Sequence, residues 1–338
     1  RRTQIVMPAR DMRHVTPVTW PALRVSPWID RVYWPSANRL EFRNTALRRL
    51  PADMPWLRCL VVPSDAGLVL DAIGWGVAPE IVASTEQVVK WSGDATEPPA
   101  RPLESLRVSA GRSTPSAALL EVIKFAFQRH PVSLRSLDAS SFGGCQDVAK
   151  YIASLTTLES LSITTGNPDS VAGDLLTTIP SPPPVMQRLD SFELVGEGMT
   201  LDRMHIHTLF GAAQLASMLT SLAIVSCGVV SDSFIAVCRS LDADPAVLPM
   251  LRELSFATNL IDDAAVSQLA GCRRVWCKLE ALDLRSNPFK EYDGLNLIVQ
   301  CFQRSASLKR LRLYPAGGHN ILLSLKRINA ERGSGPVF

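Results

Sequence analysis

Histidine and cysteine are the residue types in this chain that could bind a metal or act as nucleophiles, so their spacing is the first test of its chemistry. The chain has five histidines and seven cysteines: His14, His130, His205, His207, His319, Cys59, Cys145, Cys227, Cys238, Cys272, Cys277 and Cys301. They form no CxxC pair and no Cys/His cluster at the spacing of zinc ligands. His205 and His207, two residues apart, lie on opposite sides of the helix expected there and are poorly placed to share a metal. The sequence therefore predicts no metal site.

Sequence motifs for catalysis and cofactor binding are also missing. The chain contains no G-x-S-x-G nucleophile motif, no phosphate-binding P-loop and no H-E-x-x-H motif. Gly196 and Gly198 form a GxG and Gly317 and Gly318 a Gly pair, but neither belongs to a dinucleotide-binding fingerprint, and both are better explained as turns. We therefore predict a protein that is not an enzyme, needs no cofactor and has no small-molecule substrate.

Positive charge is concentrated at the N-terminus. The first sixty residues contain eleven Arg, no Lys and four acidic residues, a net charge of +7, although the whole chain carries only +3. Such an arm, with Arg1, Arg2, Arg10 and Arg13, can dock on RNA or on an acidic protein surface, or it can simply solvate a loosely folded extension. An Arg-rich, acid-poor beginning is also typical of precursors that are targeted to organelles.

The cysteine number and the hydropathy pattern indicate where the protein works. An odd number of cysteines at irregular spacing favours a reducing, intracellular compartment, which could be the cytoplasm or the mitochondrial matrix. No apolar run reaches the length of about eighteen residues that a membrane helix needs. The longest run, 66–78, contains Asp71. We expect a protein that does not insert into membranes.

One apolar pattern, L-x-x-L-x-L, recurs along the chain. Its copies begin at Leu57, Leu103, Leu134, Leu158, Leu189, Leu219, Leu251, Leu279 and Leu308, with Val, Ile, Phe or Ala at some later positions. From Leu103 onward, successive copies begin 24 to 32 residues apart. A period of this length is the signature of a repeat architecture, in which each unit buries its apolar face against its neighbours.

Three consecutive copies add Cys or Asn three places after the third apolar position. These residues are Cys227 in LTSLAIVSCGV, Asn259 in LRELSFATNLI and Asn287 in LEALDLRSNPF. A side chain at this position must hydrogen-bond to the backbone where the chain turns out of its strand. The three segments resemble the leucine-rich-repeat family, and their period is similar to that of its ribonuclease-inhibitor-like class of long repeats. The earlier copies and the copy at Leu308 carry other residues at the turn.

This resemblance implies an α/β fold, a leucine-rich-repeat solenoid that is curved, with a parallel β-sheet on its concave face and helices on its convex face. The segments between the expected strands agree with it, because they have helical periodicity. These segments are 116–129, 147–155, 232–241, 262–269 and 294–302.

The sequence divides into three predicted parts. Residues 1–56 form a basic N-terminal extension and cap that is rich in Trp, Arg and Pro, and residues 57–318 hold about nine repeats. Residues 319–338 form a capping helix, expected at 320–328, and a tail. The interval from Leu57 to Leu103 is too long for one repeat, so we expect an insertion or a degenerate unit at 64–102.

The concave face is where a repeat protein of this kind would bind a partner. In each strand the residues between the apolar positions alternate to that face. Most of them are Ser or Ala, but the last strands place Arg285, Arg310, Arg312 and Tyr314 there. Arg and Tyr are over-represented at binding hot spots, and Arg also binds phosphate or carboxylate groups, whereas the alternative is an ordinary solvated charged face. These four residues and the four N-terminal arginines are the candidate partner-binding residues.

The predicted function is that of a non-enzymatic protein-protein interaction scaffold, a structural or assembly subunit of a larger intracellular complex. One alternative is a ribonucleoprotein subunit, associated for example with the mitochondrial ribosome, whose arginine-rich arm contacts RNA phosphates. A second alternative is a regulator of small GTPases, because the chain resembles the leucine-rich-repeat activators of those enzymes in fold; no distinctive activating residue can be carried over.

Overall fold

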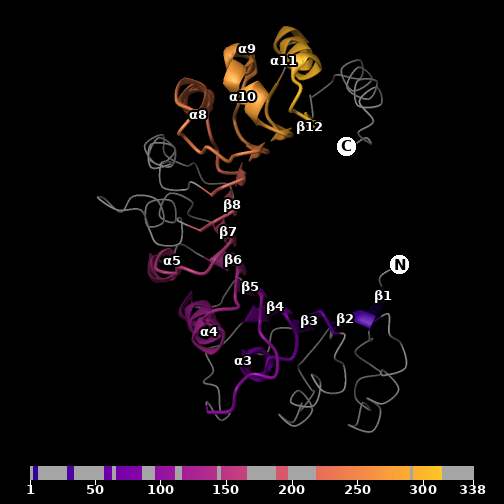
Figure 1. The fold of residues 1–338 in the computed structure, drawn as a ribbon, viewed down its shortest axis with the longest axis vertical. Coiled ribbons are helices and arrows are strands. Elements are labelled where there is room, and N and C mark those ends of the chain that lie inside the picture. The colour runs from indigo at the N-terminus through magenta and orange to yellow at the C-terminus, as the bar shows by residue number, and fades with distance from the viewer. Residues whose placement is uncertain are drawn as a thin grey trace. The chain divides into compact units, whose positions relative to one another are not determined.

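The computed structural model describes ten segments of the chain: residues 3–6, 29–33, 57–62, 66–85, 96–110, 116–142, 146–165, 188–196, 218–289 and 292–313. They fall into two compact units, Arg1–Tyr151 and Ile152–Phe338. Within each unit the described strands form a parallel sheet (Figure 1).

The described strands of the first unit pair in chain order, and every pair is parallel. They are β1 (Thr3–Val6), β2 (Ile29–Tyr33), β3 (Cys59–Val62), β4 (Glu80–Thr85), β5 (Ser105–Ala110) and β6 (Ser136–Phe142). Helix α3 (Ala66–Trp75) joins β3 to β4, and α4 (Ser116–Arg129) joins β5 to β6. Parallel pairing requires a crossover connection between neighbouring strands, and a helix is its usual form. The helix predicted at 116–129 is confirmed.

The long interval between Leu57 and Leu103 contains α3 and β4. In β4, Ile81 pairs in register with Leu60 of β3 and with Leu106 of β5. Ala78, Ile81 and Ala83 occupy the three apolar positions of the repeat and are all buried. This interval therefore contains a repeat in which Ala replaces the larger apolar residue at two of the three positions.

Strands β1 and β2 lie within residues 1–56 and continue the parallel pairing to β3. The L-x-x-L-x-L pattern did not predict them. The remainder of 1–56, like the capping helix expected at 320–328, lies outside the described residues. The division of the chain into extension, repeats and C-terminal cap therefore stays a prediction.

The described strands of the second unit also pair in chain order and in parallel. They are β7 (Ser160–Thr165), β8 (Ser191–Gly196), β9 (Ser221–Val225), β10 (Glu253–Ser255), β11 (Ala281–Asp283) and β12 (Arg310–Arg312). The described helices that follow β9 are α8 (Ser231–Ala243), α9 (Asp263–Gly271), α10 (Arg273–Lys278) and α11 (Tyr292–Arg304). They lie on one side of the β9–β12 sheet, and no described helix covers its other side, which is called the open face below (Figure 1). The helices predicted at 232–241, 262–269 and 294–302 are confirmed, whereas the short α10 was not predicted.

Helix α5 (Gln146–Ala153) crosses the boundary between the two units and confirms the helix predicted at 147–155. None of the described helices is long and apolar enough to cross a membrane.

Alternating burial along the strands separates the core of the second unit from its open face. In β7 and β8 every second side chain is buried and the ones between are half-buried. The central apolar residues of the six strands lie in register, each at most 4% exposed: Leu161, Phe192, Leu222, Leu254, Leu282 and Leu311. This row forms the core against the helices, so the residues on either side of it must point to the open face.

Two asparagines join consecutive repeats where the strands end. The Asn259 side-chain oxygen accepts hydrogen bonds from the backbone N–H groups of Cys227 and Val229, both at 3.0 Å. Its amide nitrogen donates to the backbone oxygen of Ile224 at 2.8 Å. Asn287 repeats this arrangement one repeat later, accepting from Ile261 at 3.1 Å and donating to Phe256 at 2.9 Å. The role predicted for these turn residues is confirmed.

The residue before each of these turn residues has a left-handed backbone. The φ angles are 55° at Ser226, 57° at Thr258 and 56° at Ser286. A left-handed conformation is uncommon for residues other than Gly and is least favourable for a β-branched one such as Thr258. The same turn therefore recurs in three consecutive repeats and is imposed by the hydrogen bonds of the turn, not by glycine.

A buried histidine holds the helices of the first unit to its sheet. His130 follows α4 and is 2% exposed. Its Nδ1 accepts a hydrogen bond from the backbone N–H of Leu103 at 3.2 Å, and its Nε2 lies 2.9 Å from the backbone oxygen of Ile73. Because a carbonyl oxygen can only accept, Nε2 carries the proton and the ring is neutral.

Acidification is expected to destabilise the first unit through this histidine. Burial lowers the pKa of His130, a hydrogen bond to Ile73 opposes this, and the charge of Arg129 lowers the pKa further. As the pH falls, this histidine is protonated in the unfolded chain, where its pKa is 6.5, before it is protonated in the folded chain. The free energy of unfolding therefore falls as the pH drops below that value. The free energy of unfolding can change by at most about 1.4 kcal/mol per pH unit through this group, the limit for one proton. Urea unfolding at pH 7.5 and 5.5 measures this loss.

The control for this prediction is the His130→Gln variant, whose side chain does not titrate. It is expected to be less stable than the wild type at pH 7.5 but to lose less stability on acidification, because the other four histidines are common to both proteins. An equal loss in both proteins would show that His130 does not carry the pH dependence.

Candidate functional site

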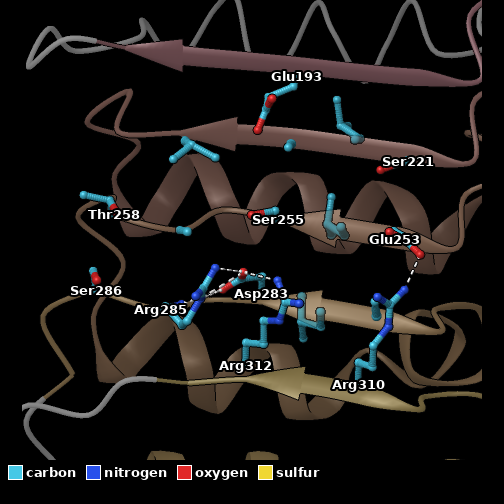
Figure 2. A pocket seen from close by; sticks show the side chains of 17 residues that line it. Glu193, Ser221, Glu253, Ser255, Thr258, Asp283, Arg285, Ser286, Arg310 and Arg312 are labelled. Atoms are coloured by element: carbon cyan, nitrogen blue, oxygen red, sulfur yellow. Dashed lines mark hydrogen bonds and ion pairs between the residues drawn. The ribbon is translucent and has the colours of Figure 1, made fainter. Parts of the chain in front are cut away.

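A pocket of about 670 Å³ lies on the open face of the second unit (Figure 2). Its walls come from β8 to β12 and from the turns after β10 and β11, where Thr258 and Ser286 lie. It is therefore built by consecutive repeats, mostly from the residues that alternate away from the core, together with the edges of the core leucines Leu222, Leu254 and Leu282.

The strand register arranges most of the outward-facing lining residues in two rows that run across the strands. The first row is Ser221, Glu253, Ala281 and Arg310, and the middle row is Glu193, Ala223, Ser255, Asp283 and Arg312. Beyond the middle row, Val225 ends β9, and Ala257 and Arg285 lie in the turns after β10 and β11. Between the acidic residues and the arginines the rows hold small side chains, mostly Ser and Ala. The pocket thus has small residues between its charged ones, with Glu193 over β8 at one end and the arginines over β11 and β12 at the other.

Asp283 holds two of the three pocket arginines. Arg285, two residues further on in the turn after β11, donates from Nε and Nη2 to both carboxylate oxygens at 2.8 to 3.1 Å. This bidentate contact raises the pKa of the Arg285 guanidinium, against the lowering effect of burial. Arg312, the neighbour of Asp283 in the middle row, makes a longer ion pair, with its Nη1 3.5 Å from Oδ2. The Asp283 side chain is only 12% exposed, so the arrangement is partly shielded from water.

The third arginine pairs with a carboxylate two strands away. Arg310 of β12 donates to Glu253 of β10 and passes over β11 (Figure 2). The first-row residue of β11 between them is Ala281, whose short side chain leaves space for this contact. A larger residue at position 281 would separate the pair.

The structure brings together part of the predicted site. Arg285, Arg310 and Arg312 line one pocket, whereas Tyr314 and the N-terminal arginines Arg1, Arg2, Arg10 and Arg13 lie outside the described residues. The assignment of all these residues to partner binding stays a prediction.

Sequence reasoning named the arginines of the pocket but not its carboxylates. Glu193, Glu253 and Asp283 match the three arginines in number, so the lining is neutral overall. The alternation of the strands placed these acids on the open face, and that signal could have identified them as partners of the arginines. The cluster is therefore not the purely positive surface that the arginine residues alone indicated.

The described part of the chain contains no group of three or more His, Cys, Asp or Glu residues that could hold a metal ion. The chemistry that the described pocket offers is hydrogen bonding and charge pairing on a face built by several repeats.

Comparison with known proteins identifies the type of fold. No family model matches the sequence, and no curated protein matches it. The structure is similar to the leucine-rich-repeat-containing protein LegL7 from Legionella pneumophila, with a TM-score of 0.52 and 11% identity over 99% of this chain and 98% of that one. It is also similar to a chain of the Rad7 and Elc1 complex in yeast, with a TM-score of 0.54 and 14% identity over 95% of this chain and 78% of that one. Together with the repeated motif and the parallel sheets, these similarities show that the chain has the leucine-rich-repeat fold.

Proposed function

We propose that this protein is a non-enzymatic interaction scaffold that binds a protein partner on the open face of β8 to β12. The observation that supports this most directly is the pocket of about 670 Å³ on that face. Solenoids of repeats generate extended binding surfaces of this kind, and the small residues of the floor let the backbone of a partner approach closely.

The charges of the pocket favour protein over nucleic acid as the partner. Its three arginines face three carboxylates, so the lining has no net charge. Binding to a nucleic-acid backbone depends on an excess of positive charge that neutralises phosphates. A neutral lining of acids and bases matches the mixed charges of a protein surface better.

A substitution that fills the pocket tests this proposal. Ser255 lies in the middle row and lines the pocket, and Ser255→Trp would place a large side chain on its floor. We expect this variant, used as bait in extracts of the source cells, to retain at least about tenfold less of the protein set that the wild type captures, because a filled pocket excludes its ligand. Quantitative mass spectrometry of the captured proteins measures the difference.

The matched control is Ser267→Trp, on the exposed surface of α9, which is expected to capture the same proteins as the wild type. Ribonuclease treatment provides a second comparison. Equal capture by Ser255→Trp and the wild type would place binding elsewhere on the chain, and loss of the captured proteins on RNA digestion would favour the ribonucleoprotein alternative.

A further inference from the structure

We propose that the segment bound in this pocket carries both charges: a cationic side chain that pairs with Glu193 over β8, and a carboxylate that pairs with Arg312 over β12. This inference rests on the proposed function and specifies the chemistry and spacing of the partner. It follows from the charges that the pocket leaves unbalanced at its two ends.

Glu193 supplies the negative end. It is half-buried, and Ser162 of the neighbouring strand donates a hydrogen bond to its Oε2 at 2.8 Å. Among the residues that the structure describes, none forms an ion pair with it, and Figure 2 shows it apart from the arginines of the pocket. A partly buried carboxylate that receives a hydrogen bond from a neutral hydroxyl, and no ion pair from the described residues, is stabilised by a cation from a ligand.

Arg312 supplies the positive end. Asp283 is shared by two guanidinium groups, and Arg285 already contacts both of its oxygens. One carboxylate between two arginines leaves one positive charge, and it lies on Arg312, whose contact is the longer at 3.5 Å. The pair of Arg310 with Glu253 is neutral and adds no charge to either end.

A carboxylate suits this positive end better than a phosphate. The three side chains Asp283, Arg285 and Arg312 together carry a single positive charge, which one carboxylate balances. A phosphate group carries about −1.5 to −2 at neutral pH and would also meet the negative charge of Asp283 at close range. The geometry therefore favours an Asp or Glu side chain, or a chain terminus, of a protein.

The strand register sets the distance between the two ends. Glu193 and Arg312 belong to the same row, with Ala223, Ser255 and Asp283 between them. Four steps between adjacent strands span about 19 Å. An extended segment covers that distance in about six residues and a helix in about thirteen. Ala223 and Ser255 are too small to obstruct a backbone that crosses the row.

Selection of peptides on charge-altered variants tests the inference. The probe is a display library of random peptides about 16 residues long, a length that covers both conformations. It is selected on the full chain as wild type, as Glu193→Lys and as Arg312→Glu. The wild type is expected to enrich peptides with one basic and one acidic residue at either of the two spacings. Glu193→Lys is expected to enrich peptides with two acidic residues, and Arg312→Glu peptides with two basic residues.

The affinities of the enriched peptides measure how much each of the two charges contributes to binding. Glu193→Gln and Arg312→Gln, which remove a charge without reversing it, are each expected to weaken binding of the wild-type peptides by about tenfold, as for the loss of one charged hydrogen-bond partner. Arg273→Glu, on exposed α10, makes the same charge change as Arg312→Glu and is expected to leave binding unchanged. Circular dichroism of each variant shows whether it is folded.

The possible failures separate the two proposals. In one outcome, Ser255→Trp blocks binding of the enriched peptides, but the wild type, Glu193→Lys and Arg312→Glu all enrich peptides with the same charges. This result would overturn the present inference and leave the pocket as a protein-binding site. Peptides that Ser255→Trp does not affect, or the absence of any enriched peptide, would overturn both.

Discussion

Asn259→Ala is expected to lower the free energy of unfolding by about 4 kcal/mol, because it removes several buried hydrogen bonds at once. Asn259 is 4% exposed, and the backbone N–H groups of Cys227 and Val229 that it satisfies belong to residues with no exposed surface. Alanine leaves both donors, and the Ile224 oxygen, without the partner that Asn259 provides. A buried donor without a partner costs about 1 to 3 kcal/mol. Urea unfolding followed by circular dichroism measures the change.

The control is Gln268→Ala in the same unit. Gln268 is exposed on α9, and its side-chain oxygen accepts a hydrogen bond from Arg239 on the surface. Loss of an exposed amide is expected to change stability by less than about 0.5 kcal/mol. If Asn259→Ala lowered the free energy of unfolding no more than this control, water would have to reach the turn and replace the lost hydrogen bonds. The Asn259 side chain would then not be what joins these repeats.

The turns were predictable from sequence because the asparagine has few substitutes. A side chain there must accept from N–H groups and donate to carbonyl groups at fixed places, which Asn259 and Asn287 do with one amide each. Cys227 has the same position in its repeat, and its thiol donates to the backbone oxygens of Val225 and Leu194. The residue type and spacing therefore identified both the turns and the fold.

The repeat at β4 was harder to predict because its core residues are small. Ala78 and Ala83 are buried like the leucines of other repeats, but their side chains do not distinguish a strand from other buried structure. The repeat is recognised only from the three-dimensional structure, in which Ile81 lies in register between Leu60 and Leu106. Strands β1 and β2 became visible in the same way, through their pairing.

The candidate site was predictable in outline but not in its pairing. Alternation along the strands indicates which residues face the pocket, and Arg285, Arg310 and Arg312 were identified in this way. It cannot indicate that Arg310 reaches past Ala281 to Glu253, or that Asp283 serves two arginines, because those contacts depend on register and on side-chain conformation across strands. The charge separation between Glu193 and Arg312 depends on these pairings and emerges only from the structure.

Gly76→Ala is expected to lower the stability of the first unit by about 3 kcal/mol, because backbone conformation and lack of space both oppose a side chain there. Gly76 ends α3 with φ of 61°, a left-handed conformation that L-residues rarely adopt. Its N–H donates to Ile73 at 3.1 Å and that of Val77 to Ala72 at 3.3 Å, the two hydrogen bonds of a Schellman motif. A Cβ at this position would lie 2.3 Å from the backbone oxygen of Arg101.

The same substitution in α9 provides the matched control. A Cβ on Gly271 would meet nothing within 4 Å, so Gly271→Ala is expected to leave stability unchanged or raise it by up to about 1 kcal/mol. Urea unfolding of both variants compares the effects. Hydrogen exchange at the Ala100 amide, which donates to Trp75 at 2.9 Å, reports whether the backbone near Arg101 has moved. Equal stability of the two glycine variants would mean that the segment around Arg101 can move to accommodate a methyl group. Its packing against the end of α3 would then not be what holds the repeat of β4 in the sheet.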